Sequence, residues 1–291
     1  MAKDTYSQTI SPKQFGQVIG MSESSLKRWV DSGHLHVTRT VGGHRRISIK
    51  EALRFIRSRS LKVRDSSPLR MTVNTESFST DDCNSLFMHY LKKGMAEEAR
   101  QLIFNEFIKG ATLAELGDGL FKTSLEIISL EGNSANNILI EHRATQICIQ
   151  IINSLHELIV EEKTLFQAVG GAISGDVYAL PSMLVAAVLK ENHGAAINLG
   201  PNTPLDVFRE ASVRLEQSKK PDLVWISISE LKNPRELSEE LSRFAHECDE
   251  DQIELIIGGR AAGKLTLDHK TSLTLHASLN SISKQLIAFK K

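Results

Sequence analysis

A pair of glycines between two short cationic segments is the feature that most constrains the fold of this chain. Gly42-Gly43 separates His36–Arg39 from Arg45–Ile49, and the composition of both segments is that of β-strands. Because glycine adopts positive φ readily, the pair predicts a tight turn between antiparallel strands. The sequence therefore predicts a hairpin whose tip and second strand are rich in cations.

Two short helices are predicted ahead of this hairpin. Ser11-Pro12 begins the first, because a serine side chain caps free amide donors and proline suits the first helical position. Ser22 caps the second helix, which Gly33 ends and whose inward positions are Leu26, Trp29 and Val30. Two helices joined by a short turn predict a helix-turn-helix, and the basic hairpin beside them predicts the wing of such a domain. A third helix is expected over residues 50–59.

The charge of the chain is divided between its two ends. Residues 1–70 hold 14 Lys and Arg against 5 Asp and Glu, a net charge of +9, and the remaining residues hold 21 against 30, a net charge of −9. A basic segment joined to an acidic one indicates that the first part binds a polyanion and the second does not.

The middle of the chain, residues 78–162, has the periodicity of four amphipathic helices, the last over residues 135–160, and predicts a four-helix bundle. Residues 163–291 alternate short apolar runs with helical windows, which predicts an α/β, doubly wound parallel sheet of Rossmann-like type. The expected strands are 164–169, 195–198, 223–228 and 254–257, and the expected helices are 182–192, 204–218, 233–249 and 280–289.

Ligands of such sheets bind at the carboxyl ends of the strands. The residues expected at those ends are Gly170-Gly171, Leu199-Gly200, Ser227-Ile228-Ser229 and Gly258-Gly259.

The N-terminal pattern resembles the MerR-type winged helix-turn-helix over about fifty residues, through Ser22 to Trp29 and Arg39 to Arg46. The resemblance implies that the second helix enters the major groove of DNA while the wing holds phosphates, with Lys27 and Arg28 the best candidates for contacts to base edges. The expected DNA-binding residues are Ser24, Ser25, Lys27, Arg28, Arg39, Thr40, Gly42, Gly43, His44, Arg45 and Arg46.

The order of the segments is similar to that of the CarH/LitR group of cobalamin-binding repressors. Local matches are Gly175-Asp176-Val177, Asn198-Leu199-Gly200, the serines at 227 and 229, and Gly258-Gly259. The resemblance implies a DNA-binding domain (1–62), a linker (63–77) extended at Ser66–Pro68, a helical cap (78–162) and a cobalamin-binding-type domain (163–291). It also implies adenosylcobalamin between cap and sheet, and release of DNA by light.

Three positions depart from that family at the cobalamin site. Tyr178 stands where the family has the cobalt-ligating histidine, Pro181 where it has glycine, and Glu131 where it has a tryptophan that shields the adenosyl group. A phenol is a poor metal ligand at neutral pH, and an imidazole is a good one. Glu141-His142 persists, either as a ligand pair or as a buried hydrogen-bonded pair.

We therefore expect no cofactor and no metal, with cobalamin held without histidine as the alternative. A different small-molecule effector also remains open. The candidate pocket residues are Glu131, Glu141, His142, Asp176, Tyr178, Ser227, Ser229, Gly258 and Gly259.

The function expected from these features is a sequence-specific transcriptional regulator, a repressor, that binds a double-stranded operator as a homodimer or tetramer. The alternatives are an adenosylcobalamin-dependent photoreceptor repressor, a corrinoid carrier for methyl transfer, and an oligomerisation scaffold for DNA-binding heads. We expect no enzyme, since no catalytic nucleophile or phosphate-loop spacing is present. Three scattered cysteines and the lack of a signal or membrane segment favour the cytoplasm.

Overall fold

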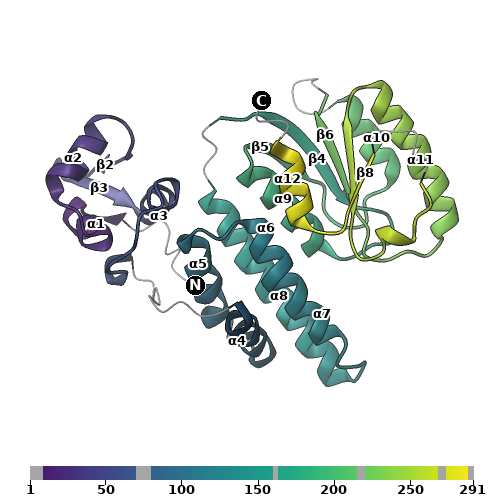
Figure 1. Cartoon of the computed structure of the whole chain (residues 1–291), viewed down its shortest axis with the longest axis horizontal. Helices are drawn as coiled ribbons and strands as arrows, with labels where there is room; N and C mark the ends of the chain where they lie inside the picture. Colours follow the sequence, from purple (N-terminus) through teal and green to yellow (C-terminus); the bar gives the residue numbers. More distant parts are fainter. Residues whose placement is uncertain (1–8, 70–79, 160–162, 215–219, 268–272, 288–291) are drawn as a thin grey trace. The chain divides into compact units, whose positions relative to one another are not determined.

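The computed structural model describes residues 9–69, 80–159, 163–214, 220–267 and 273–287 (Figure 1). The chain divides into two compact units. The first comprises Met1–Thr112, Ser124–Ile147 and Glu157–Val160, and the second comprises Leu113–Thr123, Cys148–His156 and Glu161–Lys291. The domain boundaries expected at residues 62, 77 and 162 stay a prediction.

The first unit begins with three short helices and a small antiparallel sheet in the order β1-β3-β2. The elements are β1 (Thr9–Ile10), α1 (Pro12–Ile19), α2 (Glu23–Asp31), β2 (Thr38–Arg39), β3 (Arg45–Ser48) and α3 (Ile49–Ser58). The Ser11 and Ser22 side chains cap α1 and α2 as expected, each accepting a backbone N–H three residues on. Helix α2 ends at Asp31, ahead of the expected stop at Gly33.

Both wing strands are shorter than the sequence predicts. Ile49 belongs to α3, because the Ser48 side chain accepts the N–H of Glu51 and caps that helix. His36 precedes β2, because its N–H is donated to the Glu51 carboxylate at 2.7 Å and not to a neighbouring strand. The hairpin therefore pairs only Thr38 with Arg46 and Arg39 with Arg45.

Aromatic side chains hold these helices together. Phe15 and Phe55 are fully buried, with ring centroids 6.0 Å apart, and the Trp29 ring lies 4.8 Å from that of Phe55. The expected inward positions of Leu26 and Trp29 are confirmed, although Trp29 is only half-buried. Trp29 is thus a packing residue of α2 and leaves the opposite face of the helix to polar side chains.

The segment after α3 packs against α1. The Arg64 N–H is donated to the Val18 carbonyl at 2.7 Å, Ser67–Leu69 forms a single 3₁₀ turn (η2), and the Leu69 side chain is fully buried. The expectation that Ser66–Pro68 is an extended linker is wrong, because a buried leucine anchors these residues. Residues 70–77 of the predicted linker lie outside the described residues.

Helices fill the middle of the chain, as the periodicity predicts. They are α4 (Thr80–Lys93), α5 (Ala96–Lys109), α6 (Leu113–Leu116), α7 (Thr123–Ser129) and α8 (Ala135–Leu158). A π-helical turn, Gly117–Lys122 (η3), joins α6 to α7 and was not predicted. In the second unit, the Asp118 carboxylate of this turn accepts the backbone N–H groups of Leu279 and Asn280, each at 2.9 Å. That carboxylate thereby caps the start of the last helix of the chain.

The second unit contains a five-stranded parallel sheet in the order β5-β4-β6-β7-β8, which confirms the α/β prediction. The strands are β4 (Phe166–Ala172), β5 (Gly194–Asn198), β6 (Leu223–Ser227), β7 (Glu254–Gly258) and β8 (Thr274–His276). The helices are α9 (Ala179–Glu191), α10 (Leu205–Val213), α11 (Pro234–Glu250) and α12 (Leu279–Gln285). Strand β8 was missed by sequence reasoning, and residues 215–218 of the helix predicted over 204–218 lie outside the described residues.

Helices cover both faces of this sheet (Figure 1). Leu223 and Trp225 of β6 pack on one face with residues of α9 and α12, and Val224 and Ile226 pack on the other with residues of α10 and α11. Because successive strand residues point to opposite faces, a strand buried on both sides is apolar throughout. This explains why β6 is a continuous apolar run.

The glycines of β4 lie inside the strand. The structure corrects the prediction that Gly170-Gly171 marks its carboxyl end, because β4 continues to Ala172. Gly170 is the neighbour of Trp225 on the adjacent strand, and a Cβ atom at Gly170 would lie 2.1 Å from Cδ2 of the indole. This glycine makes room for a buried tryptophan and not for a ligand.

Replacing Gly170 with alanine should therefore destabilise the second unit by about 1–3 kcal/mol or more, because the methyl group overpacks the indole. The control is Gly263→Ala, where an added Cβ meets nothing within 4 Å, and its effect should stay within about 0.5 kcal/mol. The measurement is urea unfolding followed by Trp225 fluorescence in a Trp29→Phe background, which leaves one of the two tryptophans. Equal stability of the two alanine variants would contradict this packing.

Candidate functional site

The wing turn is closed by three hydrogen bonds. The Gly43 N–H is donated to the Thr40 carbonyl at 2.8 Å, the Thr40 N–H to the His44 carbonyl at 3.0 Å, and the His44 N–H to Thr40 Oγ1 at 3.2 Å. Gly43 has φ of +78°, the left-handed region in which glycine is unstrained. The predicted hairpin is confirmed, and the Thr40 hydroxyl oxygen is an acceptor within the turn.

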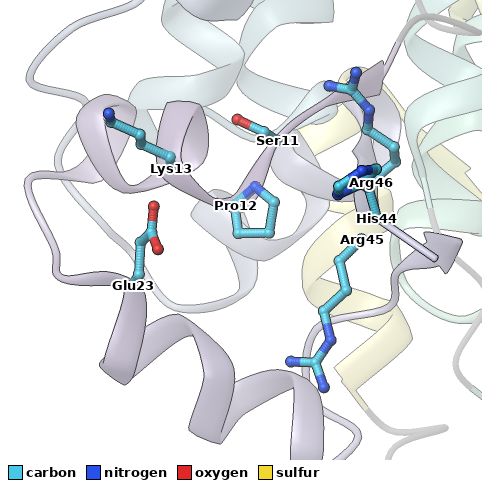
Figure 2. Close-up of a pocket in the computed structure, with 7 residues that line it drawn as sticks. All are labelled: Ser11, Pro12, Lys13, Glu23, His44, Arg45 and Arg46. Atoms are coloured by element: carbon cyan, nitrogen blue, oxygen red, sulfur yellow. The ribbon is translucent and has the colours of Figure 1, made fainter. Parts of the chain in front are cut away.

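The two adjacent arginines of the wing have different environments. Arg45 Nη2 lies 3.0 Å from Asp31 Oδ1, and Asp31 is the last residue of α2, so this ion pair joins the wing to the second helix. Arg46 is the next residue of the strand, and Figure 2 shows its side chain extending away from that of Arg45. Among the described residues, Arg46 has no side-chain ion pair.

A shallow cavity of about 310 Å³ lies between the wing and the starts of α1 and α2 (Figure 2). It is lined by Ser11, Pro12, Lys13, Glu23, His44, Arg45 and Arg46. Its lining carries three cations and one carboxylate, and Asp31 pairs with one of the cations, Arg45. A net positive charge remains, so the hollow favours an anion.

The second helix exposes two cations. Lys27 and Arg28 are exposed, and neither forms a side-chain ion pair with another residue in the described part of the chain. The neighbouring serines are engaged in the helix cap, since Ser22 Oγ lies 2.8 Å from Ser24 Oγ and 3.1 Å from Ser25 Oγ. Of the four predicted contact residues on this helix, the two cations are the ones free to reach a ligand.

A half-buried carboxylate fixes the base of the wing. Burial raises the pKa of Glu51, but hydrogen bonds from the Arg54 guanidinium and from the His36 N–H outweigh it and lower the pKa overall. Arg54 also donates to the His34 carbonyl at 3.0 Å. Arg54 therefore belongs to the scaffold of the hairpin and not to its outer surface.

The carboxyl edge of the sheet, in the second unit, contains a fully buried carboxylate. Asp176 follows β4; its Oδ1 accepts the Tyr178 N–H at 3.0 Å and its Oδ2 accepts the Ser229 N–H at 2.5 Å. The Asn202 N–H is donated to the Asp176 carbonyl, and the Gly175 N–H to Asn202 Oδ1, each at 2.8 Å. Asp176 thus joins the loops that follow β4, β5 and β6, and each of its carboxylate oxygens accepts a backbone N–H.

Tyr178 lies at the start of α9, where its ring contacts a cation. The Arg260 guanidinium lies 4.9 Å from the ring centroid, and Arg260 Nε donates to the Ser229 carbonyl at 2.9 Å. The structure therefore brings together Asp176, Tyr178 and Ser229 of the predicted pocket. Sequence reasoning missed Arg260, although its position directly after Gly258-Gly259 at a strand end was a signal for it.

The remaining strand-end residues are used by the protein itself. Ser227 is buried and pairs with Gly258 across β6 and β7. Gly259 has φ of +109°, and a Cβ atom there would lie 2.3 Å from the Ile228 carbonyl oxygen. Gly259 therefore allows its backbone to lie close to that of Ile228, where a Cβ atom would clash.

The predicted cap residues belong to the first unit and are largely solvent-exposed. Glu131 is exposed and forms an ion pair with Lys92. His142 is exposed and Glu141 is half-buried, so the interpretation of Glu141-His142 as a buried hydrogen-bonded pair is wrong. His142 lies on the outward side of α8, because the buried side of this helix consists of residues such as Ala144, Ile147 and Cys148.

A histidine at the end of β8 is part of the core. His276 is buried; its Nδ1 lies 2.8 Å from Ser281 Oγ and its Nε2 is hydrogen-bonded to Gln285. Burial lowers the pKa of His276, although the hydrogen bond to Gln285 acts in the opposite direction. Both ring nitrogens have partners, so this imidazole is not available to a metal. In the described residues, no three His, Cys, Asp or Glu side chains gather as a metal site.

No family model matches the sequence, and no curated protein matches it. Solved structures do match. The monomethylamine corrinoid protein of Methanosarcina barkeri is 13% identical, with a TM-score of 0.53 over 73% of this chain and 99% of that one. Two weaker likenesses are the methanol:cobalamin methyltransferase complex of the same organism (14% identity, 92% of each chain, TM-score 0.34) and a cobalamin-binding protein of Desulfitobacterium hafniense (12% identity, 73% of this chain and 99% of that one, TM-score 0.35).

The first of these likenesses shows the fold alone: the chain contains a Rossmann-like domain whose fold is similar to that of this corrinoid protein. This supports the expected cobalamin-binding-type domain. Among the described helices, none has the length and apolar character that crossing a bilayer requires.

The residues at the sheet edge do not fit a histidine-ligated corrinoid. Position 178 offers a phenol, and its ring lies against Arg260. The carboxylate two residues earlier, which would orient an imidazole ligand, instead accepts two backbone N–H groups. The loop at this edge therefore offers cobalt no imidazole.

Replacing Asp176 with asparagine should destabilise the second unit by about 1–3 kcal/mol, because the amide would turn an N–H donor toward a buried backbone N–H. Glu230→Gln is the control, because Glu230 is exposed beside the same loop, and it should change stability by less than about 0.5 kcal/mol. Both variants are compared by Trp225 fluorescence during urea unfolding. A neutral Asp176→Asn substitution would show that the two hydrogen bonds do not hold the loops.

Proposed function

We propose that the chain is a DNA-binding transcriptional regulator, a repressor, with a winged helix-turn-helix at its N-terminus. The observation that carries the proposal is the ion pair between Arg45 of the wing and Asp31 of α2, at 3.0 Å. It fixes a cationic hairpin beside a helix with exposed cations, which is the arrangement that grips a duplex in this class of DNA-binding domain.

Each part of this surface has a role in the proposal. Helix α2 enters the major groove, where Lys27 and Arg28 reach base edges, because cations pair well with the acceptors of guanine. The hollow beside the wing receives a backbone phosphate between Lys13 and Arg46. Gly42 and Gly43 let the tip approach the backbone closely, and Arg39 and His44 flank it.

The proposed regulator acts as a homodimer or tetramer. One small winged module buries a limited surface, and two modules gain specificity by spanning two half-sites of an operator. The acidic remainder of the chain, with a net charge of −9, does not add to DNA affinity and is the part proposed to assemble the copies. In this proposal its corrinoid-type domain binds no cofactor or responds to a different small molecule.

A corrinoid carrier is the second candidate, and the likeness to a corrinoid protein favours it. The carrier requires a group that holds the corrinoid, and the residue at the loop position is Tyr178, whose ring is covered by Arg260. An adenosylcobalamin-dependent photoreceptor repressor without histidine ligation would combine DNA binding with corrinoid binding. It would therefore also require a group that holds the corrinoid.

The first test of the proposal is the Arg46→Ala substitution. A duplex selected from a random-sequence pool should bind the variant more weakly at every sequence, and the slope of log K against log salt should become shallower by about 1, because one phosphate contact is lost. The measurement is fluorescence anisotropy at several salt concentrations.

The matched control is Arg235→Ala, since Arg235 lies on α11 with its side chain 95% exposed and should not contact DNA. Equal salt slopes for the wild type and the Arg46→Ala variant would overturn the wing assignment. A wild type that selects no duplex from the pool would overturn the regulator itself.

The second test is retention of cobalamin. After incubation with adenosylcobalamin in the dark and desalting, the proposed regulator should show no corrin absorption bands, because the loop lacks an imidazole. Retained bands at a stoichiometric level would favour the carrier or the photoreceptor. In that case Tyr178→Ala would show whether the phenol contributes to binding.

A further inference from the structure

An apolar side chain projects from the tip of the wing. Val41 has a relative exposure of 111%, the highest among the large hydrophobic residues in the part of the chain that the structure describes. Its neighbours Gly42 and Gly43 have no side chains, so Val41 is the side chain that extends at the turn between Thr40 and His44. A single exposed apolar residue is ordinary on a protein surface, and the inference depends on how this one is held.

The turn holds Val41 in a fixed place. Val41 and Gly42 are the central residues of a turn closed by the bond from the Gly43 N–H to the Thr40 carbonyl, at 2.8 Å. The His44 N–H binds Thr40 Oγ1 at 3.2 Å and braces the same turn. A side chain presented by a closed turn loses little backbone entropy when it enters a groove.

Cations stand on both sides of this valine. Arg39 ends the strand before the turn, and its register partner Arg45, whose guanidinium is paired with Asp31, begins the strand after it. Cationic groups favour a narrow minor groove, where the negative potential of DNA is enhanced. An apolar tip between cations is therefore suited to the minor groove more than to a phosphate.

We propose that Val41 enters the minor groove and makes the wing select A·T base pairs at the position it covers. This inference rests on the proposed function. The A·T pair presents only acceptors on the floor of that groove, whereas the G·C pair adds the guanine 2-amino group, a donor that projects into it. Covering that donor with a valine would remove its water without supplying an acceptor, which is unfavourable.

The test uses the base inosine, which lacks the 2-amino group but presents the major-groove pattern of guanine. The operator is first selected from a random-sequence pool with the full wild-type chain. Each A·T pair of the selected operator is then replaced in turn by G·C and by inosine·C, and affinities are measured by anisotropy. At the positions under the wing, G·C should lower wild-type affinity about fivefold or more, and inosine·C should restore it.

Val41→Ala should reduce this G·C penalty to about twofold or less, because the shorter side chain leaves space for the amino group and its water. Val207→Thr is the matched control; Val207 is an exposed valine of α10, and this variant should keep the full penalty. The inference is overturned if the wild type shows no inosine-rescued position, or if Val41→Ala keeps the penalty. If no operator can be selected, the proposed DNA-binding function is contradicted. If an operator is selected but the inosine test fails, only the proposed role of Val41 is contradicted.

Discussion

The proposed DNA-binding surface depends on one backbone constraint, the positive φ of Gly43. With this residue in the left-handed region, the turn closes through Thr40 and His44, and Thr38 and Arg39 pair with Arg46 and Arg45. That register fixes which arginine points to which face. One residue of slippage would exchange the faces of the two arginines, so that Arg45 would turn away from Asp31.

In the second unit, the residues that specify the fold differ from those that would determine ligand binding. Alternate burial of β6 residues on two helical layers is enough to specify a Rossmann-like sheet, and it is this architecture that resembles the corrinoid protein. Ligand chemistry depends instead on a few loop residues at the sheet edge. In this chain Asp176 binds backbone N–H groups of two loops, and Tyr178 lies against Arg260. The edge is thus closed by its own hydrogen bonds.

Much of the fold could be predicted from the sequence, because caps and periodicity are local signals. Ser11 and Ser22 give helix starts, and Gly42-Gly43 gives the turn. The errors arise where a tertiary contact decides. Gly170 was interpreted as a strand end because its packing against Trp225 is visible only across two strands. Residues 66–68 were interpreted as a linker, but the buried side chain of Leu69 anchors them to the fold. Strand β8 is too short to have a periodicity of its own.

The candidate sites were predictable to different degrees. The sequence predicts the cations of the wing as one group, and only the structure distinguishes Arg45, which is bound to Asp31, from Arg46, which is not. The exposure of His142 could not be predicted, since a position on a long helix faces solvent or core according to the neighbouring elements. Arg260 was missed because its contact with Tyr178 joins residues far apart in the chain.

The most direct test of the central claim is photocrosslinking of the full chain to a random-sequence duplex that carries 5-bromouracil, followed by mass spectrometry of the crosslinked peptides. If the winged surface binds the duplex, crosslinks should fall within residues 11–46, where the wing and the second helix lie. Crosslinks confined to the sheet unit, or none at all at low salt, would contradict it.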